Sequence, residues 1–198
     1  MGRDEERPLV ERLWAGEELA FAEVVRTYQN RIFNIVFRML SNRQEAEDVA
    51  QEVFVSFYTS IHRFRGDCSI SSWLYKIAIN QCRNRIKYLR LRRVTRDDSF
   101  NERSLRGIAH DDVIGAPDFQ AQVPRPDDLA EGLQMERFIQ EALTSLEEDQ
   151  RTLIVLRDIE GLTYQDMVEV LDEPLGTIKS RLHRARMALK DKLARLLK

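Results

Sequence analysis

The residues with the clearest chemical potential lie near the C-terminal end of the 198-residue chain, where hydrogen-bond donors recur at helical spacing. Four of them share one face of a helix, because residues three and four apart lie on the same side: Lys179, Ser180, His183 and Arg184. Their side chains can donate to base edges and phosphates in a major groove. This face predicts a helix that reads duplex DNA. The alternative is a basic amphipathic helix that is merely solvated or lies on a membrane surface.

A tight corner between two helices would position this face. Thr163 can cap a first helix. A turn around Asp172 and Glu173 then leads to Pro174, which suits the start of a second helix because its missing N–H is not needed there. The second helix carries an apolar stripe for burial: Leu175, Ile178, Leu182, Ala185, Leu189 and Leu193. The pattern is typical of a helix-turn-helix and favours DNA reading over the membrane alternative.

A second candidate site lies on a helix expected from Ser72 to about Arg93. The stripe opposite its apolar face combines an indole, two amides and a cation: Trp73, Ile77, Asn80, Asn84, Lys87 and Leu91. Stacking on the indole and hydrogen bonds from the amides would suit an unpaired base. Phe64 and the loop from Asp67 lie beside the start of the stripe. The alternative is that Trp73 closes the core and the asparagines are solvated.

A third candidate site lies on the helix expected from Gln44 to His62. Its core face is apolar and is formed by Ala46, Val49, Ala50, Val53, Phe57, Ser60 and Ile61. Its outward face mixes acidic, amide and apolar side chains: Asp48, Gln51, Glu52, Val55 and Tyr58, with Phe54 at the edge. Apolar groups among exposed carboxylates fit a protein docking surface, although single exposed apolar residues are also common.

The sequence predicts an all-α protein with two helical domains joined by a flexible linker. The domains are expected at 9–94 and 133–198, and 43% hydrophobic content can supply both cores. The linker, 95–132, is acidic and holds three of the five prolines. An ordered insertion is the alternative there. Because the formal net charge is only −2, attraction to nucleic acid must come from local basic patches.

Several function classes find no support. The chain has no apolar run of about 18 residues and no leader pattern, so we expect no membrane insertion and a cytoplasmic location. Cys68 and Cys82 form no CxxC pattern, and the three histidines are scattered, so we expect no metal. No phosphate-binding glycine loop or activated nucleophile is recognisable, so we predict no cofactor and no enzymatic activity.

Taken together, these segments resemble the extracytoplasmic-function group of bacterial sigma factors. The resemblance is carried, in family order, by Ala46–Phe54, Phe64–Asp67, Ser72–Asn80, Leu156–Tyr164 and Pro174–Arg186. It covers both expected domains. One departure is Asp172, at a turn position where relatives often carry glycine; aspartate tolerates the left-handed conformation such a turn needs.

The resemblance implies a dissociable subunit that binds core RNA polymerase and directs it to promoters. At the duplex −35 element it implies base contacts from Lys179, Ser180, His183 and Arg184, and phosphate contacts from Arg157, Tyr164 and Thr177. At the single-stranded −10 element it implies Phe64, Asp67, Ser72, Trp73, Ile77, Asn80 and Asn84. For docking on core polymerase the resemblance implies Asp48, Gln51, Glu52, Phe54 and Val55.

The resemblance also implies an anti-sigma factor as a further partner. A competing hypothesis is a self-sufficient helix-turn-helix regulator that does not replace the sigma subunit. That hypothesis explains the C-terminal corner but gives no role to the stripe of Asn80 and Asn84 or to the acidic docking face.

Overall fold

The computed structural model describes the backbone of residues 3–97 and 126–196. Every regular element within these ranges is a helix, and the chain forms two helical domains, as predicted. Helices α4 (Ile70–Asp97) and α5 (Pro126–Thr144) extend into the predicted linker, 95–132; residues 98–125 lie outside the described ranges. None of the described helices combines the length and the apolar character needed to cross a bilayer.

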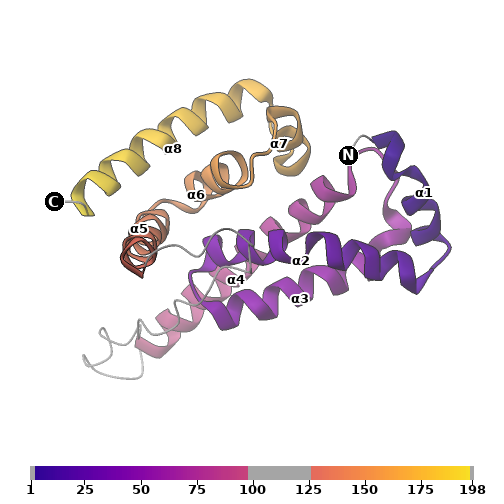
Figure 1. Cartoon of the computed structure of the whole chain (residues 1–198), viewed down its shortest axis with the longest axis horizontal. Helices are drawn as coiled ribbons and strands as arrows, with labels where there is room; N and C mark the ends of the chain where they lie inside the picture. Colours follow the sequence, from indigo (N-terminus) through magenta and orange to yellow (C-terminus); the bar gives the residue numbers. More distant parts are fainter. Residues whose placement is uncertain (1–2, 98–125, 197–198) are drawn as a thin grey trace.

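The N-terminal domain consists of α1 (Arg3–Trp14), α2 (Glu18–Leu40), α3 (Arg43–Ser60), the 3-10 turn η1 (Ile61–Arg63) and α4. Local chemistry sets the corner between α2 and α3. Ser41 takes a left-handed conformation at φ 57°, and its N–H closes α2 on the carbonyl of Phe37. The side chain of Asn42 then accepts the N–H of Glu45 at 3.0 Å and caps α3. Consequently α2 and α3 lie side by side (Figure 1).

The core of this domain follows the predicted apolar stripes. On α3, Ala46, Val49 and Phe57 are fully buried. On α4, Cys82 is also fully buried. Burial, with the nearby Glu148 carboxylate, raises the pKa of the Cys82 thiol to about 12, since a thiolate there would lose its hydration. Cys82 therefore packs as a small apolar side chain.

The C-terminal domain consists of α5, α6 (Glu148–Ile154), the π-helical turn η2 (Val155–Ile159), α7 (Tyr164–Leu171) and α8 (Leu175–Leu196). Helix α6 continues directly into η2. The predicted corner between α7 and α8 is present. The Thr163 hydroxyl accepts the N–H of Asp166 at 3.1 Å, and the Asp166 carboxylate accepts the N–H of Thr163 at 2.9 Å. Asp172 ends α7 at φ 59°.

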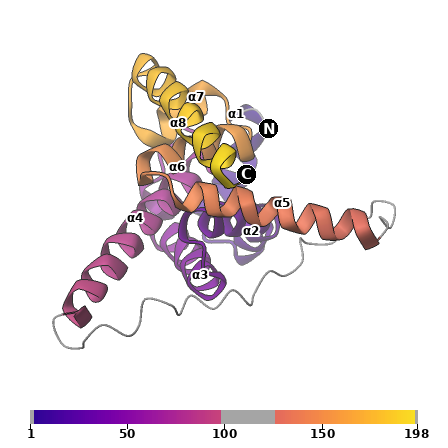
Figure 2. The ribbon, with the colours of Figure 1, turned by 90° about the vertical axis from the view of Figure 1, so that its left-hand side faces the viewer.

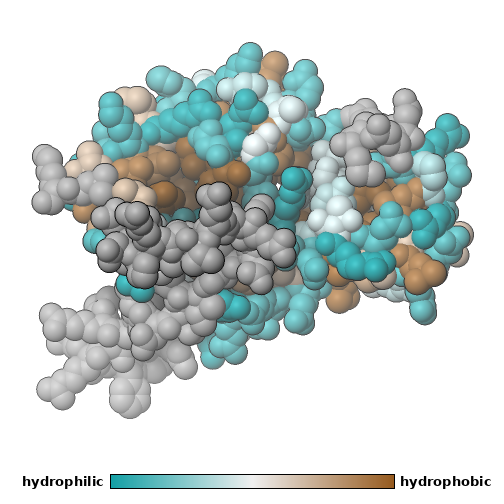
Figure 3. Space-filling view, in the orientation of Figure 1, coloured by the Kyte–Doolittle hydropathy of each residue, from teal (hydrophilic) through white to brown (hydrophobic). Residues whose placement is uncertain are grey.

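The two domains pack against each other, an arrangement that the sequence analysis does not predict. Helix α4 lies against α7, and α2 lies against α5, α6 and η2. Buried apolar residues of both domains, such as Ile35 and Leu156, belong to one core cluster. Figure 2 shows the C-terminal end of α4 and the N-terminal end of α5 projecting away from this shared core. On the face seen in Figure 3, apolar residues gather between α8 and α5.

Candidate nucleic-acid interfaces and docking face

The first site is the outward face of α8, whose early turns follow the corner at Asp172. The inward residues Ile178 and Leu182 are buried and fix the rotation of the helix against α6 and α7. The predicted reading residues are consequently all exposed: Lys179, Ser180, His183 and Arg184. The face thus presents cationic and neutral donors from two successive turns, which is the geometry that base reading in a major groove requires.

A cationic cluster supports the start of this face. The guanidinium of Arg157 stacks on the ring of Tyr164, 4.8 Å from the ring centroid, and the ammonium of Lys179 lies 5.5 Å from the same centroid. Arg157 also donates to the carbonyl of Leu162, so one of its N–H groups is already used in a hydrogen bond within the fold. Thr177 is half-buried one turn before the reading face. Of the three predicted phosphate-contacting residues, Arg157 and Tyr164 therefore also hold each other in place within the fold.

Another arginine of α8 has a structural task. Arg186 forms a paired contact with the Asp158 carboxylate, Nε to Oδ2 at 3.0 Å and Nη2 to Oδ1 at 2.5 Å. Its hydrogen bond to Asp158 raises the pKa of Arg186. The pair joins α8 to η2 and helps to hold the reading helix in place.

The second site is on α4, where the predicted stripe changes character along the helix. Asn80 and Asn84 are exposed, and Ile77 is half-buried. Trp73 is half-buried too, since its ring stacks on Phe64, with centroids 4.7 Å apart, and is tilted against Phe57 at 5.3 Å. Phe64 therefore occupies one side of the Trp73 indole, and Trp73 packs against the core while it remains half-buried.

Two further residues of the predicted −10 set are internal. Phe64 is 5% exposed, and Ser72 is 2% exposed and receives a hydrogen bond from the Ser69 hydroxyl at 2.9 Å. Both side chains therefore pack inside the fold in this arrangement. Asp67 in the same loop is exposed. The exposed members of the predicted −10 set are thus Asp67, Asn80 and Asn84.

Helix α1 holds both ends of the loop before α4, which the sequence analysis missed. The buried carboxylate of Glu6 accepts the N–H of Ile70 at 2.9 Å, and the indole of Trp14 donates to the carbonyl of Phe64 at 3.1 Å. These contacts join residues 50 and 64 positions apart, so no local spacing could have revealed them.

The third site, on α3, has the predicted mixture of groups. Asp48, Gln51, Glu52 and Val55 are exposed, Val55 by 62%, whereas Phe54 is half-buried. Arg85 of α4 reaches this helix and contacts Glu45 at 2.9 Å and Glu52 at 2.8 Å. The face therefore presents carboxylates, an amide and an apolar side chain on a helix fixed by its neighbour.

Comparison with known proteins shows the family to which the chain belongs. Residues 24–92 match the family model of sigma-70 region 2, and residues 138–189 match that of sigma-70 region 4. Along the whole chain, a sigma-E factor of the extracytoplasmic-function group from Haemophilus influenzae is 35% identical over 194 residues, 97% of this chain and 97% of the relative. The chain belongs to the extracytoplasmic-function family of sigma factors.

Other relatives agree with that membership. The RNA polymerase sigma-H factor of Pseudomonas aeruginosa is 34% identical over 196 residues, 99% of this chain and 97% of the relative. SigW of Bacillus subtilis is 33% identical over 184 residues, 93% of this chain and 94% of the relative. As a member of this family the protein is an alternative sigma factor: it binds core RNA polymerase and directs initiation at specific promoters. The alternative of a self-sufficient regulator leaves the region 2 match without a role.

Solved sigma factors have the same fold. The structure of CnrH in complex with the cytosolic domain of CnrY aligns with a TM-score of 0.67 at 20% identity, covering 96% of this chain and 97% of CnrH. RpoE of Bartonella quintana, in complex with the anti-sigma factor NepR, aligns with a TM-score of 0.63 at 24% identity, covering 88% of this chain and 96% of RpoE.

Proposed function

We propose that this sigma factor divides its work between three faces. The α8 face reads the duplex −35 element, the α4 face with its preceding loop opens and holds the −10 element, and the outward face of α3 docks on core polymerase. The observation that carries the proposal is the joint exposure of the polar groups on α8 and α4, while the residues beside them are buried.

At the −35 element, we assign base contacts to the exposed donors Lys179, Ser180, His183 and Arg184. We assign phosphate contacts to Tyr164, Arg157 and Thr177. Phosphate contacts position a protein on the duplex and base contacts choose the sequence. The Tyr164 cluster, lying beside the first reading turn, suits the positioning task.

At the −10 element, we assign direct contacts to Asn80, Asn84 and Asp67, with Ile77 at the edge. Amide side chains can pair with the edge of a base that has left the stack. The packed residues are Phe64, Ser72 and Trp73. We assign them an indirect role in the −10 contact, which is to hold the loop and the start of α4 in position.

Transcription with purified components tests this division. The protein is combined with core polymerase and with promoters selected from genomic DNA, and transcripts and unpaired thymines in the −10 region are measured. We expect specific transcripts and an opened −10 region without any other sigma factor. If another sigma subunit is always required, the assignment of the −10 face fails, and a regulator reading only duplex DNA takes its place.

Docking on polymerase is a separate assignment, carried by the mixed face of α3 with Asp48, Gln51, Glu52, Phe54 and Val55. Charge complementarity with a basic polymerase surface would select the partner, and Val55 would supply apolar contact. Replacement of Val55 by Asp should weaken binding to core polymerase, measured by size exclusion or anisotropy. Unchanged binding would remove this face from the interface.

We infer three further properties from family membership. The protein acts in the cytoplasm, where its polymerase is found. It contributes binding and positioning, not catalysis. An anti-sigma factor regulates it, as the solved neighbours bound to partner proteins suggest. Purification of the native protein from uninduced cells should recover an equimolar partner that prevents binding to core polymerase; recovery of free, polymerase-competent protein would argue against such regulation.

A further inference from the structure

We propose that Trp14, the last residue of α1, is a stacking platform for an unpaired base that lies next to the bases held by Asn80 and Asn84. This inference rests on the proposed function of the α4 face and extends that face to a helix with no DNA contact so far. Trp14 lies before residue 24, where the match to sigma-70 region 2 begins, so the family comparison gives it no role.

Local chemistry places the indole at the start of the loop before α4. Helix α1 ends at Trp14, and Gly16 turns the chain at φ 77°, a conformation that glycine adopts without strain. Helix α1 lies beside η1, which ends just before Phe64 (Figure 1). The indole N–H of Trp14 donates to the carbonyl of Phe64 at 3.1 Å. Two helix ends that are 50 positions apart in the chain therefore meet at this hydrogen bond.

The Trp14 side chain is held in place and is still open to solvent. The residue is 50% exposed, although its indole nitrogen is bonded within the fold. The other indole, that of Trp73, is half-buried and has Phe64 on one side. A ring that is already fixed in one orientation loses little conformational entropy when a ligand stacks on it. Trp14 therefore offers a base the larger open surface of the two.

Cations flank the point at which the indole is held. Arg63 and Arg65, on either side of Phe64 in the chain, are both exposed. Proteins bind single-stranded nucleic acid with aromatic rings for the bases and cations for the backbone phosphates. A fixed ring beside two cations thus has the chemistry of a single-strand contact, and this charge favours a polyanion over an apolar protein segment.

The order of side chains along α4 gives the path of the strand. Asn80 lies seven residues after Trp73, which is about 10 Å along a helix that rises 1.5 Å per residue. The Trp73 ring stacks on Phe64 with centroids 4.7 Å apart, and the carbonyl of Phe64 is bonded to Trp14. A strand that leaves Asn80 toward the N-terminal end of α4 therefore passes the loop and arrives at Trp14.

Stacking at Trp14 has a different task from the contacts at Asn80 and Asn84. Every base has a face on which an aromatic ring can stack, so such a contact tolerates any sequence. The asparagines can distinguish bases by the groups on their edges. Trp14 should consequently lengthen the lifetime of the opened strand without changing which −10 sequence is selected.

Photo-cross-linking tests the contact directly. The unmodified protein, bound to core polymerase, is mixed with a forked promoter that is duplex at the −35 element and single-stranded from the −10 element onward. The single strand carries 5-iodouracil, which cross-links to an aromatic ring on which it stacks, at one position at a time. We expect cross-links to Trp14 from a narrow group of positions beside the −10 bases, identified by mass spectrometry. Cross-links to α4 with none to Trp14 would overturn the proposal.

Two substitutions separate stacking from the support of the loop. Trp14→Phe keeps a ring and removes the donor to Phe64, whereas Trp14→Gln keeps a donor and removes the ring. We expect the glutamine variant to release the forked promoter at least about fivefold faster, and the phenylalanine variant to stay within about twofold of the unmodified protein. A loss in the phenylalanine variant as large as that in the glutamine variant would mean that Trp14 acts only through its hydrogen bond.

An abasic nucleotide at the cross-linked position is the matching change in the DNA. It should accelerate release of the unmodified protein by the same factor as Trp14→Gln. It should add little to the effect of that variant, because both changes remove the same contact. Additive effects of the two changes would contradict a direct contact between the base and the ring. Met135→Gln, at a similarly exposed apolar residue on α5, is the control and should leave release unchanged.

Asn80→Ala distinguishes a failure of this inference from a failure of the proposed function. If Asn80→Ala weakens binding of the forked promoter and Trp14→Gln does not, the α4 face stands and the stacking role of Trp14 is wrong. If the unmodified protein with core polymerase binds the forked promoter no better than duplex −35 DNA alone, the proposed −10 function itself is wrong.

Discussion

Asn80 and Trp73 lie on the same predicted stripe of α4, yet Asn80 is exposed and Trp73 is half-buried. Helical spacing fixes the direction in which a side chain leaves the helix, and that part of the prediction holds for both residues. It says nothing of what packs over the helix. Phe64, nine positions earlier, covers the Trp73 ring and leaves the two asparagines accessible. Roles at the residue scale therefore follow from burial as well as from spacing.

Arg184 provides a test of the α8 face. Arg184→Ala should weaken binding to the −35 duplex by about 1–3 kcal/mol, because it removes a donor able to pair with a base edge. Fluorescence anisotropy at fixed salt measures the loss. Lys190→Ala, at an exposed position nearly two turns later, is the control and should change affinity little. Equal effects of the two changes would mean that Arg184 supplies only general charge.

Asn80 tests the α4 face separately. Asn80→Ala should leave −35 duplex binding unchanged and should slow promoter opening, since it removes an amide and leaves the packing of α4 intact. Unpaired thymines in the −10 region measure opening. Asn30→Ala, an exposed asparagine on α2, is the matched control. Normal opening in the Asn80 variant would exclude this side chain from the base contact.

Helix α1 illustrates the element scale, because it begins at Arg3, before the predicted start of the N-terminal domain at residue 9, and its contacts were not predicted. The region 2 match begins only at residue 24, beyond α1. In the structure this helix holds the loop before α4 through Glu6 and Trp14. It therefore supports the loop and the start of α4 that form the proposed −10 face.

The Glu6 carboxylate gives a prediction for this element. Glu6→Ala leaves the buried N–H of Ile70 without an acceptor, which should cost about 1–3 kcal/mol of folding stability and slow promoter opening. Glu6→Gln keeps an oxygen acceptor and should restore most of both. Glu11→Ala, exposed on the same helix, serves as the control. Chemical denaturation and the opening assay measure the two effects; opening that follows stability alone in all variants would reduce Glu6 to a purely structural residue.

Elements set by local chemistry were predictable, and those set by distant contacts were not. The capping box at Thr163 and the left-handed Asp172 depend on neighbours within a few residues, so the corner before α8 was predicted correctly. The supports from α1 join residues more than 45 positions apart. The packing of α2 on α5 and α6 joins residues about 100 positions apart, as in the contact of Arg38 with Gln140. Neither leaves a periodic signal.

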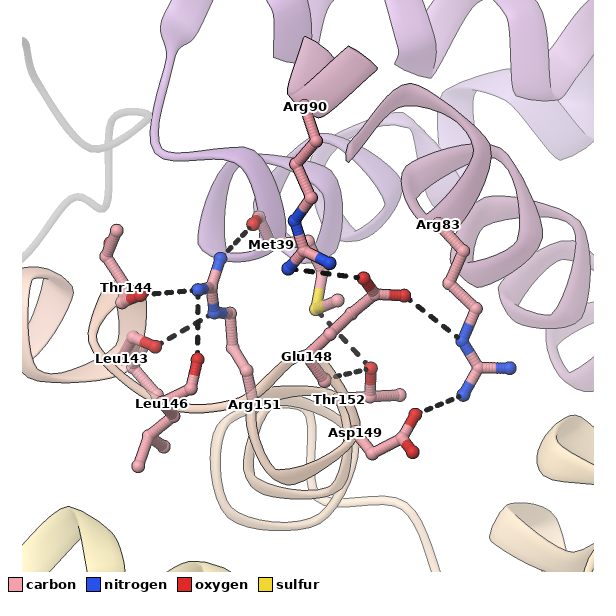
Figure 4. A network of polar contacts seen from close by, with 10 residues as sticks. All are labelled: Met39, Arg83, Arg90, Leu143, Thr144, Leu146, Glu148, Asp149, Arg151 and Thr152. Atoms are coloured by element: carbon pink, nitrogen blue, oxygen red, sulfur yellow. Dashed lines mark hydrogen bonds and ion pairs between the residues drawn. The ribbon is translucent and has the colours of Figure 1, made fainter. Parts of the chain in front are cut away.

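At the scale of the whole molecule, the shared core makes the domains depend on each other. Arg151 of α6 donates to the carbonyls of Leu143 and Met39 and ties the end of α5 to the end of α2, so its loss should be felt in both domains. Burial lowers the pKa of Arg151, yet arginine remains protonated in proteins, and its charge is stabilised by the dipoles of the surrounding carbonyls and by the nearby Glu148 carboxylate (Figure 4). The domains are therefore expected to unfold in one transition.

Arg151→Ala tests this coupling. Because it strands several buried carbonyl oxygens, it should lower the free energy of unfolding by about 3 kcal/mol or more and separate the unfolding of the two domains. Urea unfolding, followed by helical circular dichroism and by Trp73 and Trp14 fluorescence in the N-terminal domain, measures both effects. Arg137→Ala, exposed on α5, is the control. A single transition at the original midpoint would contradict the coupling.

Asp172 connects two properties that evolution could tune independently. Its left-handed backbone makes the corner before α8, while its carboxylate ties α7 to Lys76 of α4. Glycine would preserve the first property and abolish the second, and a single nucleotide change converts an aspartate codon into a glycine codon. One mutational step could thus loosen the contact between α7 and α4 and keep the corner that positions α8.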